Sequence, residues 1–248
     1  MHLSTTAIVL RKIDIGETDR VYSFLTREFG KMRATARGVR KPEAKLAGQI
    51  ETLNFVHLSV MKGRGRGNVA GAIAESHFTH IRENETSLRA ALEGVALFDG
   101  RVEDDEPDRE LFELLLGFLR ALDAVGALPM IDERDRTRRS QKIFLLSQGF
   151  SWKLFHRLGY GVELYRCAVG HEDLIANECY SFSPDAGGVV CTRHMSGARI
   201  IFPFSENAVK ALRMFVSEPL SRIVKLSLDA ETLRVLRNAL RSFLDWTR

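Results

Sequence analysis

The chain has 248 residues, of which 45% are hydrophobic and 27% are charged, so it can form one or two globular domains with a substantial core. Its formal net charge is only +4, and it has no apolar run of about 18 residues and no charged, apolar leader, which excludes a membrane span and a secretory signal. Three cysteines, an odd number, exclude a closed disulfide framework, and we expect a cytoplasmic protein with reduced thiols.

The first 80 residues are predicted to form short strands separated by turns. Five segments have strand character: Thr6 to Asp14, Arg20 to Glu28, a basic strand that begins at Gly30, Leu53 to Met61, and Val69 to Ala74. Short strands with turns at this spacing predict a small β-barrel or a sandwich.

The third strand opens a strongly basic segment. Side chains alternate across a strand, so Met32, Ala34 and Ala36 can face a core. The other side chains of the strand then face water, and the following loop and the Gly63–Gly67 turn add further cations. A row of cations suits a phosphate backbone, whereas the alternative is a solvated basic face. The predicted contacts are Lys31, Arg33, Arg37, Arg40, Lys41, Lys45, Arg64 and Arg66.

Charge is unevenly distributed along the chain. Nine Lys or Arg and two Glu lie between Lys31 and Arg66, whereas seven acidic residues and two Arg lie between Asp99 and Glu110. This asymmetry predicts a basic working face and an acidic surface elsewhere.

Aromatic side chains near the basic strand are candidates for stacking against bases. They are Tyr22, Phe24, Phe29 and Phe55, with His57 beside them. Packing in the core is the competing interpretation and is favoured for most of them, while Phe29, at a turn, is the least constrained to be buried.

Helical spacing begins near residue 80. Leu88 to Phe98, Leu111 to Val125 and Glu206 to Val216 are predicted helices, and a stripe from Ile143 to Leu158 marks another. Ser205 and Asp229 are predicted to cap the last two helices. Five basic residues precede the stripe and are either a receptor for an acidic, hydrophobic tail or a solvated helix start: Arg134, Arg136, Arg138, Arg139 and Lys142.

An irregular segment from Tyr165 to Arg199 contains all three cysteines. Zinc prefers four nitrogen or sulfur ligands arranged as two close pairs. Cys167 with His171 and Cys191 with His194 would supply them, and Cys179 could replace His171. The alternative is a knuckle that keeps its turns and holds no metal.

Several segments together resemble the RecO family of bacterial recombinational repair proteins. They are Ala7–Leu10, Ile15–Asp19, Gly30-Lys31, Ala36–Arg40, Cys167–Gly170 and Phe182–Gly188. The similarity follows the same order through nearly the whole chain. The Ala-Arg-Gly-x-Arg and Phe-Ser-Pro-x-x-Gly-Gly segments are specific in combination.

The resemblance implies an α+β protein with an N-terminal five-stranded OB-fold barrel over residues 1–80. A helical domain over 81–248 would carry a small zinc-finger-like insertion at about 165–199. The metal-binding members carry four cysteines there, and this chain has Gly170 and His194 at two of the positions.

The resemblance also implies binding of single- and double-stranded DNA and annealing of complementary strands. Its implied partners are RecR and the C-terminal tail of the single-stranded DNA-binding protein SSB, through which RecA would be loaded indirectly. The implied location is the cytoplasm, in association with the nucleoid.

We therefore expect a recombination mediator that is not an enzyme. The alternatives are an OB-fold RNA-binding protein, a protein-binding adaptor, and a zinc hydrolase built on Cys167, Cys191 and His194, for which the sequence offers no general base. No P-loop, dinucleotide-binding or nucleophile-elbow motif is present.

Overall fold

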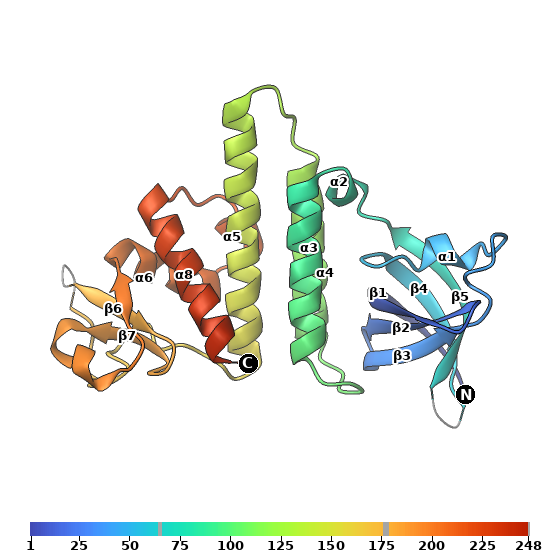
Figure 1. Ribbon diagram of the computed structural model, residues 1–248, viewed down its shortest axis with the longest axis horizontal. Coiled ribbons are helices and arrows are strands. Elements are labelled where there is room, and N and C mark those ends of the chain that lie inside the picture. Colours follow the sequence, from blue (N-terminus) through green and yellow to red (C-terminus); the bar gives the residue numbers. More distant parts are fainter. Residues whose placement is uncertain (64–65, 176–178, 248) are drawn as a thin grey trace. The chain divides into compact units, whose positions relative to one another are not determined.

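The computed structural model describes residues 1–63, 66–175 and 179–247 (Figure 1). Its contacts divide the chain into two compact units, Met1–Ile143 and Phe144–Arg248, and the division falls within the helix α5 (Glu133–Arg157). The first helices after the barrel thus belong to the first unit. The domain boundary near residue 80 stays a prediction.

The first unit begins with a closed barrel of five strands in the order β1-β2-β3-β5-β4. Neighbouring strands are antiparallel except β3 and β5, which are parallel. The OB-fold barrel and the α+β class predicted from the sequence are confirmed. The strands are β1 (His2–Ile15), β2 (Asp19–Thr26), β3 (Gly30–Ala36), β4 (Phe55–Met61) and β5 (Gly67–Ser76), with the short helix α1 (Leu46–Gln49) before β4.

The inward-facing side chains of β3 help to fill the interior of the barrel. Met32, Ala34 and Ala36 are buried as predicted, and they pack with Tyr22 and Phe24 of β2. Period-two alternation of small and large apolar side chains therefore accounts for the interior of the barrel.

A β-bulge in β1 changes which side chains face outward. Val9 pairs with Phe24, but the next pair is Arg11 with Ser23, so Leu10 is an extra residue. Because side chains alternate, the extra residue reverses the parity of the strand. Every second residue from Arg11 to Ile15 therefore faces outward.

Two long helices complete the first unit beside the short helix α2 (Thr79–Arg82). In α3 (Glu85–Arg101) the side chain of Asn84 accepts a hydrogen bond from Ser87 N at the first turn, and Asp108 does the same for α4 (Arg109–Gly126). Both helices lie where the spacing predicts them. Phe112 of α4 packs edge-on against Phe55 of β4, with ring centroids 6.3 Å apart.

The second unit surrounds a cluster of aromatic side chains. The ring of Trp152 on α5 lies 5.9 Å from Phe182 and 5.2 Å from Phe243. Ser205 and Asp229 cap their helices as predicted. The other elements are β6 (Tyr180–Ser183), β7 (Gly188–Cys191), the 3-10 helix η1 (Thr192–Gly197), β8 (Phe202–Phe204), α6 (Glu206–Ser217), α7 (Leu220–Ile223) and α8 (Ala230–Trp246).

The small sheet of the second unit has the order β7-β6-β8 and carries the cysteine-containing segment. Among the helices of the described residues, none has both the length and the apolar character that crossing a bilayer would require.

Candidate functional site

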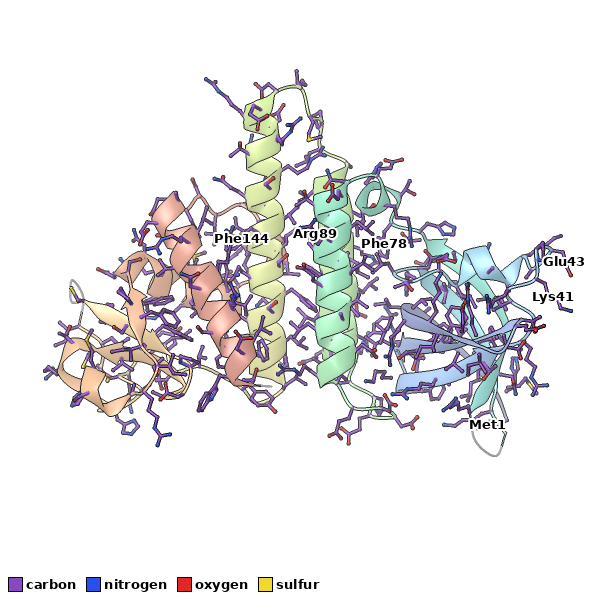
Figure 2. All side chains as sticks on the ribbon, viewed as in Figure 1. Met1, Lys41, Glu43, Phe78, Arg89 and Phe144 are labelled. Atoms are coloured by element: carbon purple, nitrogen blue, oxygen red, sulfur yellow. The ribbon has the colours of Figure 1, made fainter. Side chains whose placement is uncertain are left out.

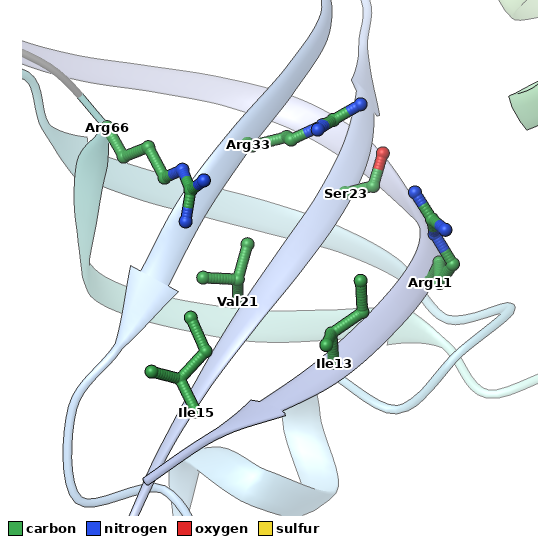
Figure 3. A pocket seen from close by; sticks show the side chains of 7 residues that line it. All are labelled: Arg11, Ile13, Ile15, Val21, Ser23, Arg33 and Arg66. Carbon is green, nitrogen blue, oxygen red and sulfur yellow. The ribbon is translucent and has the colours of Figure 1, made fainter.

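The outer face of β1, β2 and β3 contains a shallow hollow of about 210 Å³ (Figure 3). Strand register explains its layout, because Arg11 lies opposite Ser23 and Ser23 lies opposite Arg33, which makes one row across three strands. Arg66, just before β5, closes the far side. We call the lining set the arginine face: Arg11, Ile13, Ile15, Val21, Ser23, Arg33 and Arg66.

The floor of the arginine face is aliphatic, and two of its three side chains are exposed to solvent while Val21 is buried. Ile13 is 49% exposed and Ile15 is 43% exposed, and Val21 lies directly opposite Ile13. Exposed apolar side chains framed by guanidinium groups suit a ligand with flat apolar parts and anionic groups. Single-stranded nucleic acid has that chemistry, since its bases can pack on the floor while its phosphates meet the arginines.

Most of the aromatic stacking candidates belong to the core instead. Tyr22, Phe24 and Phe55 are buried, which confirms the competing interpretation for these three. Phe29 is half-buried against the barrel core. His57 is exposed on β4, with its Nε2 3.2 Å from a carboxylate oxygen of Glu75.

The turn after β1 and the loop after β3 are joined by hydrogen bonds. Asp19 accepts one from Gly38 N at 2.8 Å, and an Nη of Arg40 donates to Gly16 O at 3.0 Å. The Gly38 N–H lowers the pKa of Asp19, and the hydrogen bond from Arg20 lowers the pKa of Asp14. Two segments that carry the family resemblance therefore meet in space.

Most of the predicted cations are exposed in or beside this region. The exposed ones are Arg33, Arg37, Arg40, Lys41, Lys45 and Arg66, while Arg64 lies outside the described residues. Figure 2 shows Lys41 and Glu43 at the outer edge of the loop, pointing away from the barrel. The structure thus leaves a chain of accessible cations from the arginine face into the loop.

The prediction that Lys31 faces water is wrong. Its side chain is on the outward side of β3, as alternation requires, yet the residue is only 5% exposed. Its Nζ donates to Asp99 O at 2.7 Å and lies 3.1 Å from an Asp104 carboxylate oxygen. A segment that follows α3 covers it, so its charge is engaged within the protein.

The acidic surface expected elsewhere is also wrongly placed, because part of it lies against β3. Asp105 N donates to Lys31 O at 2.7 Å, and Asp104 lies 3.2 Å from a guanidinium nitrogen of Arg33. A Cβ at Gly30 would come within 2.3 Å of Glu106 O, so only glycine permits this approach. We call residues 99–106 the acidic segment, and it borders the cations of the interface.

The sequence reasoning missed Val21 and Ser23 of β2 and all three lining residues of β1, which are Arg11, Ile13 and Ile15. Their alternation with polar residues was visible, but apolar residues in a strand usually indicate a core. The bulge at Leu10 places these side chains on the outer face of the strand, and the residue types alone do not indicate that a bulge occurs there.

The apolar stripe that follows the basic cluster on α5 is largely buried. Leu146, Phe150 and Leu154 of the stripe are buried. Arg139 is itself buried and donates to Leu128 O. The cluster is therefore closer to the solvated helix start, with Arg136 3.3 Å from a Glu133 carboxylate oxygen.

The cysteine-containing segment gathers Cys167, Cys191 and His194, whose ligand atoms all lie within 4.8 Å of one another. This corrects the predicted set, because neither His171 nor Cys179 joins the cluster, and both residues are exposed. Burial raises the pKa of the Cys167 thiol, but N–H donation from Gly170, Cys191 and Val169 outweighs it, and the pKa is lowered to about 7.

The chain was compared with known proteins. The family described as "Recombination protein O N terminal" matches residues 1–76, and "Recombination protein O C terminal" matches residues 87–247. A protein of Roseiflexus sp. named "DNA repair protein RecO" is 34% identical over 97% of this chain and 81% of its own length. Proteins of the same name from Dehalococcoides mccartyi and Bacillus cytotoxicus are 30% and 29% identical over 96% and 99% of this chain, and over 87% and 92% of their own lengths.

Proposed function

Because the chain belongs to the RecO family of DNA repair proteins, we propose that it is a recombination mediator that binds DNA through its arginine face. The observation that carries this proposal is the aliphatic floor of Ile13, Ile15 and Val21, which is framed by three arginines on the open side of the barrel.

Each arginine would place two parallel N–H donors on a phosphate oxygen pair. The bases of a single strand would pack on the floor, which duplex bases cannot reach because they are stacked and paired. Double-stranded DNA would therefore be held by its phosphates alone, and more weakly. The exposed loop cations Arg37, Arg40, Lys41 and Lys45 would extend the phosphate contacts.

Annealing would follow from the same contacts. Neutralised phosphates repel a second strand less, so two complementary strands can approach while the bases stay available for pairing. The protein makes and breaks no covalent bond in this scheme. The proposed partners are RecR and the C-terminal tail of SSB, and through them RecA is loaded on coated single-stranded DNA.

We also propose a zinc ion in the second unit. Cys167, Cys191 and His194 would hold it, since two thiols and an imidazole within bonding reach of one point are a typical zinc donor set. Bound there, zinc would tie β7 and η1 to the Cys167 turn and stabilise the fold of this element.

The test compares binding of a fluorescent single-stranded oligonucleotide by two triple variants. Arg11→Ala, Arg33→Ala and Arg66→Ala together remove the arginine face. Arg89→Ala, Arg222→Ala and Arg234→Ala remove the same charge from exposed helical positions, where each arginine pairs with a glutamate three or four residues before it.

The first variant should bind at least about 10-fold more weakly at low salt, because three charge-assisted contacts are lost. Its plot of log K against log salt should be shallower by about 2, from roughly 0.7 per phosphate on a single strand. The control should bind like the unaltered protein. Equal losses in both variants would refute the arginine face, and a strong preference for RNA of the same sequence would favour the RNA-binding alternative.

A further inference from the structure

The cluster of Cys167, Cys191 and His194 has an oxygen donor at its edge, the carboxylate of Glu172. Its Oε1 lies 3.0 Å from His194 Nδ1 and 3.6 Å from Cys191 Sγ. The same Nδ1 lies 3.3 Å from Cys191 Sγ and 3.8 Å from Cys167 Sγ. Zinc bonds of about 2.0–2.3 Å at tetrahedral angles place ligand atoms roughly 3.3–3.8 Å apart. Four of the six separations among these groups are therefore close to those of ligands around one ion, and Glu172 lies at the edge of the three-residue cluster.

Gly170 leaves room for this carboxylate. A Cβ built at this position would lie 2.1 Å from Glu172 Oε2 and 2.3 Å from His194 Cε1, so any side chain here would displace both groups. Position 170 is one of the two at which the chain departs from the four-cysteine pattern. The space that a side chain at residue 170 would need is instead filled by Glu172.

The backbone of the turn holds Glu172 in this place. Cys167 N donates to Glu172 O at 2.8 Å, and His171 N donates to Cys167 O at 2.8 Å. His171 has a left-handed φ of 63°, and the chain reverses there. The reversal brings the carboxylate of Glu172 to the cluster, while His171 stays exposed.

Backbone N–H groups also prepare the Cys167 thiol for a metal. Gly170 N and Cys191 N lie 3.4 and 3.5 Å from Cys167 Sγ and donate to it. Such N–H donors stabilise a thiolate. Arg193 lies 3.2 Å from Glu172 Oε1, so a guanidinium would offset the one net negative charge that two thiolates, a carboxylate and a zinc ion leave.

We propose that Glu172 is the fourth ligand of this zinc site, which would make it a Cys₂HisGlu site. The imidazole and the carboxylate then take the places of two thiolates. Because all four donors come from the turn Cys167–Glu172 and from Cys191-x-x-His194, the site closes without any residue of the first unit.

The experiment uses the full chain loaded with zinc or with cobalt as a spectroscopic substitute. Glu172→Gln keeps the size of the side chain but removes its charge, and His171→Gln is the matched control at the neighbouring exposed position. We expect one zinc per chain for the unaltered protein and the control, and zinc affinity at least about 10-fold lower for Glu172→Gln in competition with a chromophoric chelator. Equal affinity in Glu172→Gln and the control, or substoichiometric zinc in the unaltered protein, would overturn the assignment.

A gain-of-ligand variant covers the case in which Glu172→Gln fails to fold. Glu172→Cys should add a third thiolate to the metal, so the thiolate-to-cobalt absorption should rise by about half, and His171→Cys should leave it unchanged. If neither variant changes this absorption, Glu172 is an ion-pair partner of His194 and Arg193 and not a ligand.

Discussion

Lys31 links the barrel to the acidic segment, and its replacement should destabilise the first unit. In Lys31→Ala, the Asp99 carboxylate, only 12% exposed, would lose its contact with the Lys31 amine, which lies 3.6 Å away. Arg11 would still pair with this carboxylate at 3.1 Å, but the carbonyl oxygen of Asp99 would lose its buried hydrogen bond from the amine, so we expect local stability to fall by about 1–3 kcal/mol. Hydrogen exchange at β3 and at the end of α3 measures this directly.

Lys45→Ala is the matched control, since Lys45 is exposed and lies within 4.0 Å of no carboxylate among the described residues. It should change stability by less than about 0.5 kcal/mol. An equal, small effect of both substitutions would mean that the amine of Lys31 contributes nothing to the packing of the acidic segment.

Ile13 should contribute to DNA affinity without contributing to its salt dependence. Ile13→Ala removes part of the floor, and we expect about fivefold weaker binding of a single strand, from roughly 1 kcal/mol of lost apolar contact. Because no charge changes, the slope of log K against log salt should stay the same.

Ile73→Ala provides the comparison, since Ile73 is 70% exposed on β5 and lies outside the arginine face. It should bind like the unaltered protein. A steepened or flattened salt dependence in Ile13→Ala would indicate that the substitution moves the arginines, and the apolar role would then be contradicted.

At the residue scale, alternation predicted which side of β3 each side chain occupies, and it did so correctly for Lys31 as well. What it could not predict was that a segment 68 residues away in the sequence covers that position. Burial on the outward side of a strand depends on what packs there, and no local pattern contains that information.

The acidic segment lies against β3, and under the proposed function it would compete with DNA for the cations of that strand. Asp104 lies 3.2 Å from Arg33, so Asp104→Asn should free this guanidinium for phosphate. A partly exposed pair contributes about 0.2–1 kcal/mol, which corresponds to single-strand binding up to roughly fivefold tighter. Fluorescence anisotropy at low salt measures it, and the gain should vanish at high salt.

Glu85→Gln serves as the charge-matched control, because Glu85 is at the opposite end of α3, about 21 Å along the helix from Asp99. If both substitutions tighten binding equally, the effect comes from net charge and not from release of Arg33.

At the element scale, the long helices and all five barrel strands could be predicted from periodicity and capping residues, whereas the short helices α1, α2 and α7 could not. Ser205 and Asp229 are caps of the expected type, with side-chain oxygens that accept from the first turn. The bulge in β1 could not be predicted, because Leu10 is as apolar as the residues that precede it. Of the arginine face, Arg33 and Arg66 were consequently predicted, but the residues of β1 and β2 were not.

At the scale of the whole molecule, acid should weaken the fold through several carboxylates at once. The N–H of Gly38 lowers the pKa of Asp19, the Arg20 hydrogen bond lowers that of Asp14, and the N–H of Thr232 lowers that of Asp229. A carboxyl group whose pKa is lower in the folded state stabilises the fold at any pH above its pKa in the unfolded state, which is near 3.8 for Asp. That stabilisation is lost as the pH falls through the pKa of the folded state.

The free energy of unfolding should therefore be nearly constant between about pH 5 and 7 and decline below about pH 4. Urea titrations across this range measure it. Asp19→Asn should show a shallower decline, because one of the linked protons is gone. A decline that begins near pH 6 instead would point to histidines as the responsible groups.

The site as a whole could be predicted only in chemical type. Cations near the amino end were evident in the sequence, and so was a cysteine and histidine cluster. Their partners were not, since Asp104 beside Arg33 and Glu172 beside His194 depend on turns and covering segments that form only in the folded chain.

The single extra residue at Leu10 constrains how this protein can vary in length. Deleting Leu10 would remove the bulge and keep Arg11 opposite Ser23, so the isoleucines would stay on the outer side, whereas deleting Lys12 would bring Ile13 opposite Tyr22 and turn it inward. Single deletions should accordingly be tolerated at Leu10 and in the turn at Gly16 but not between Arg11 and Ile15.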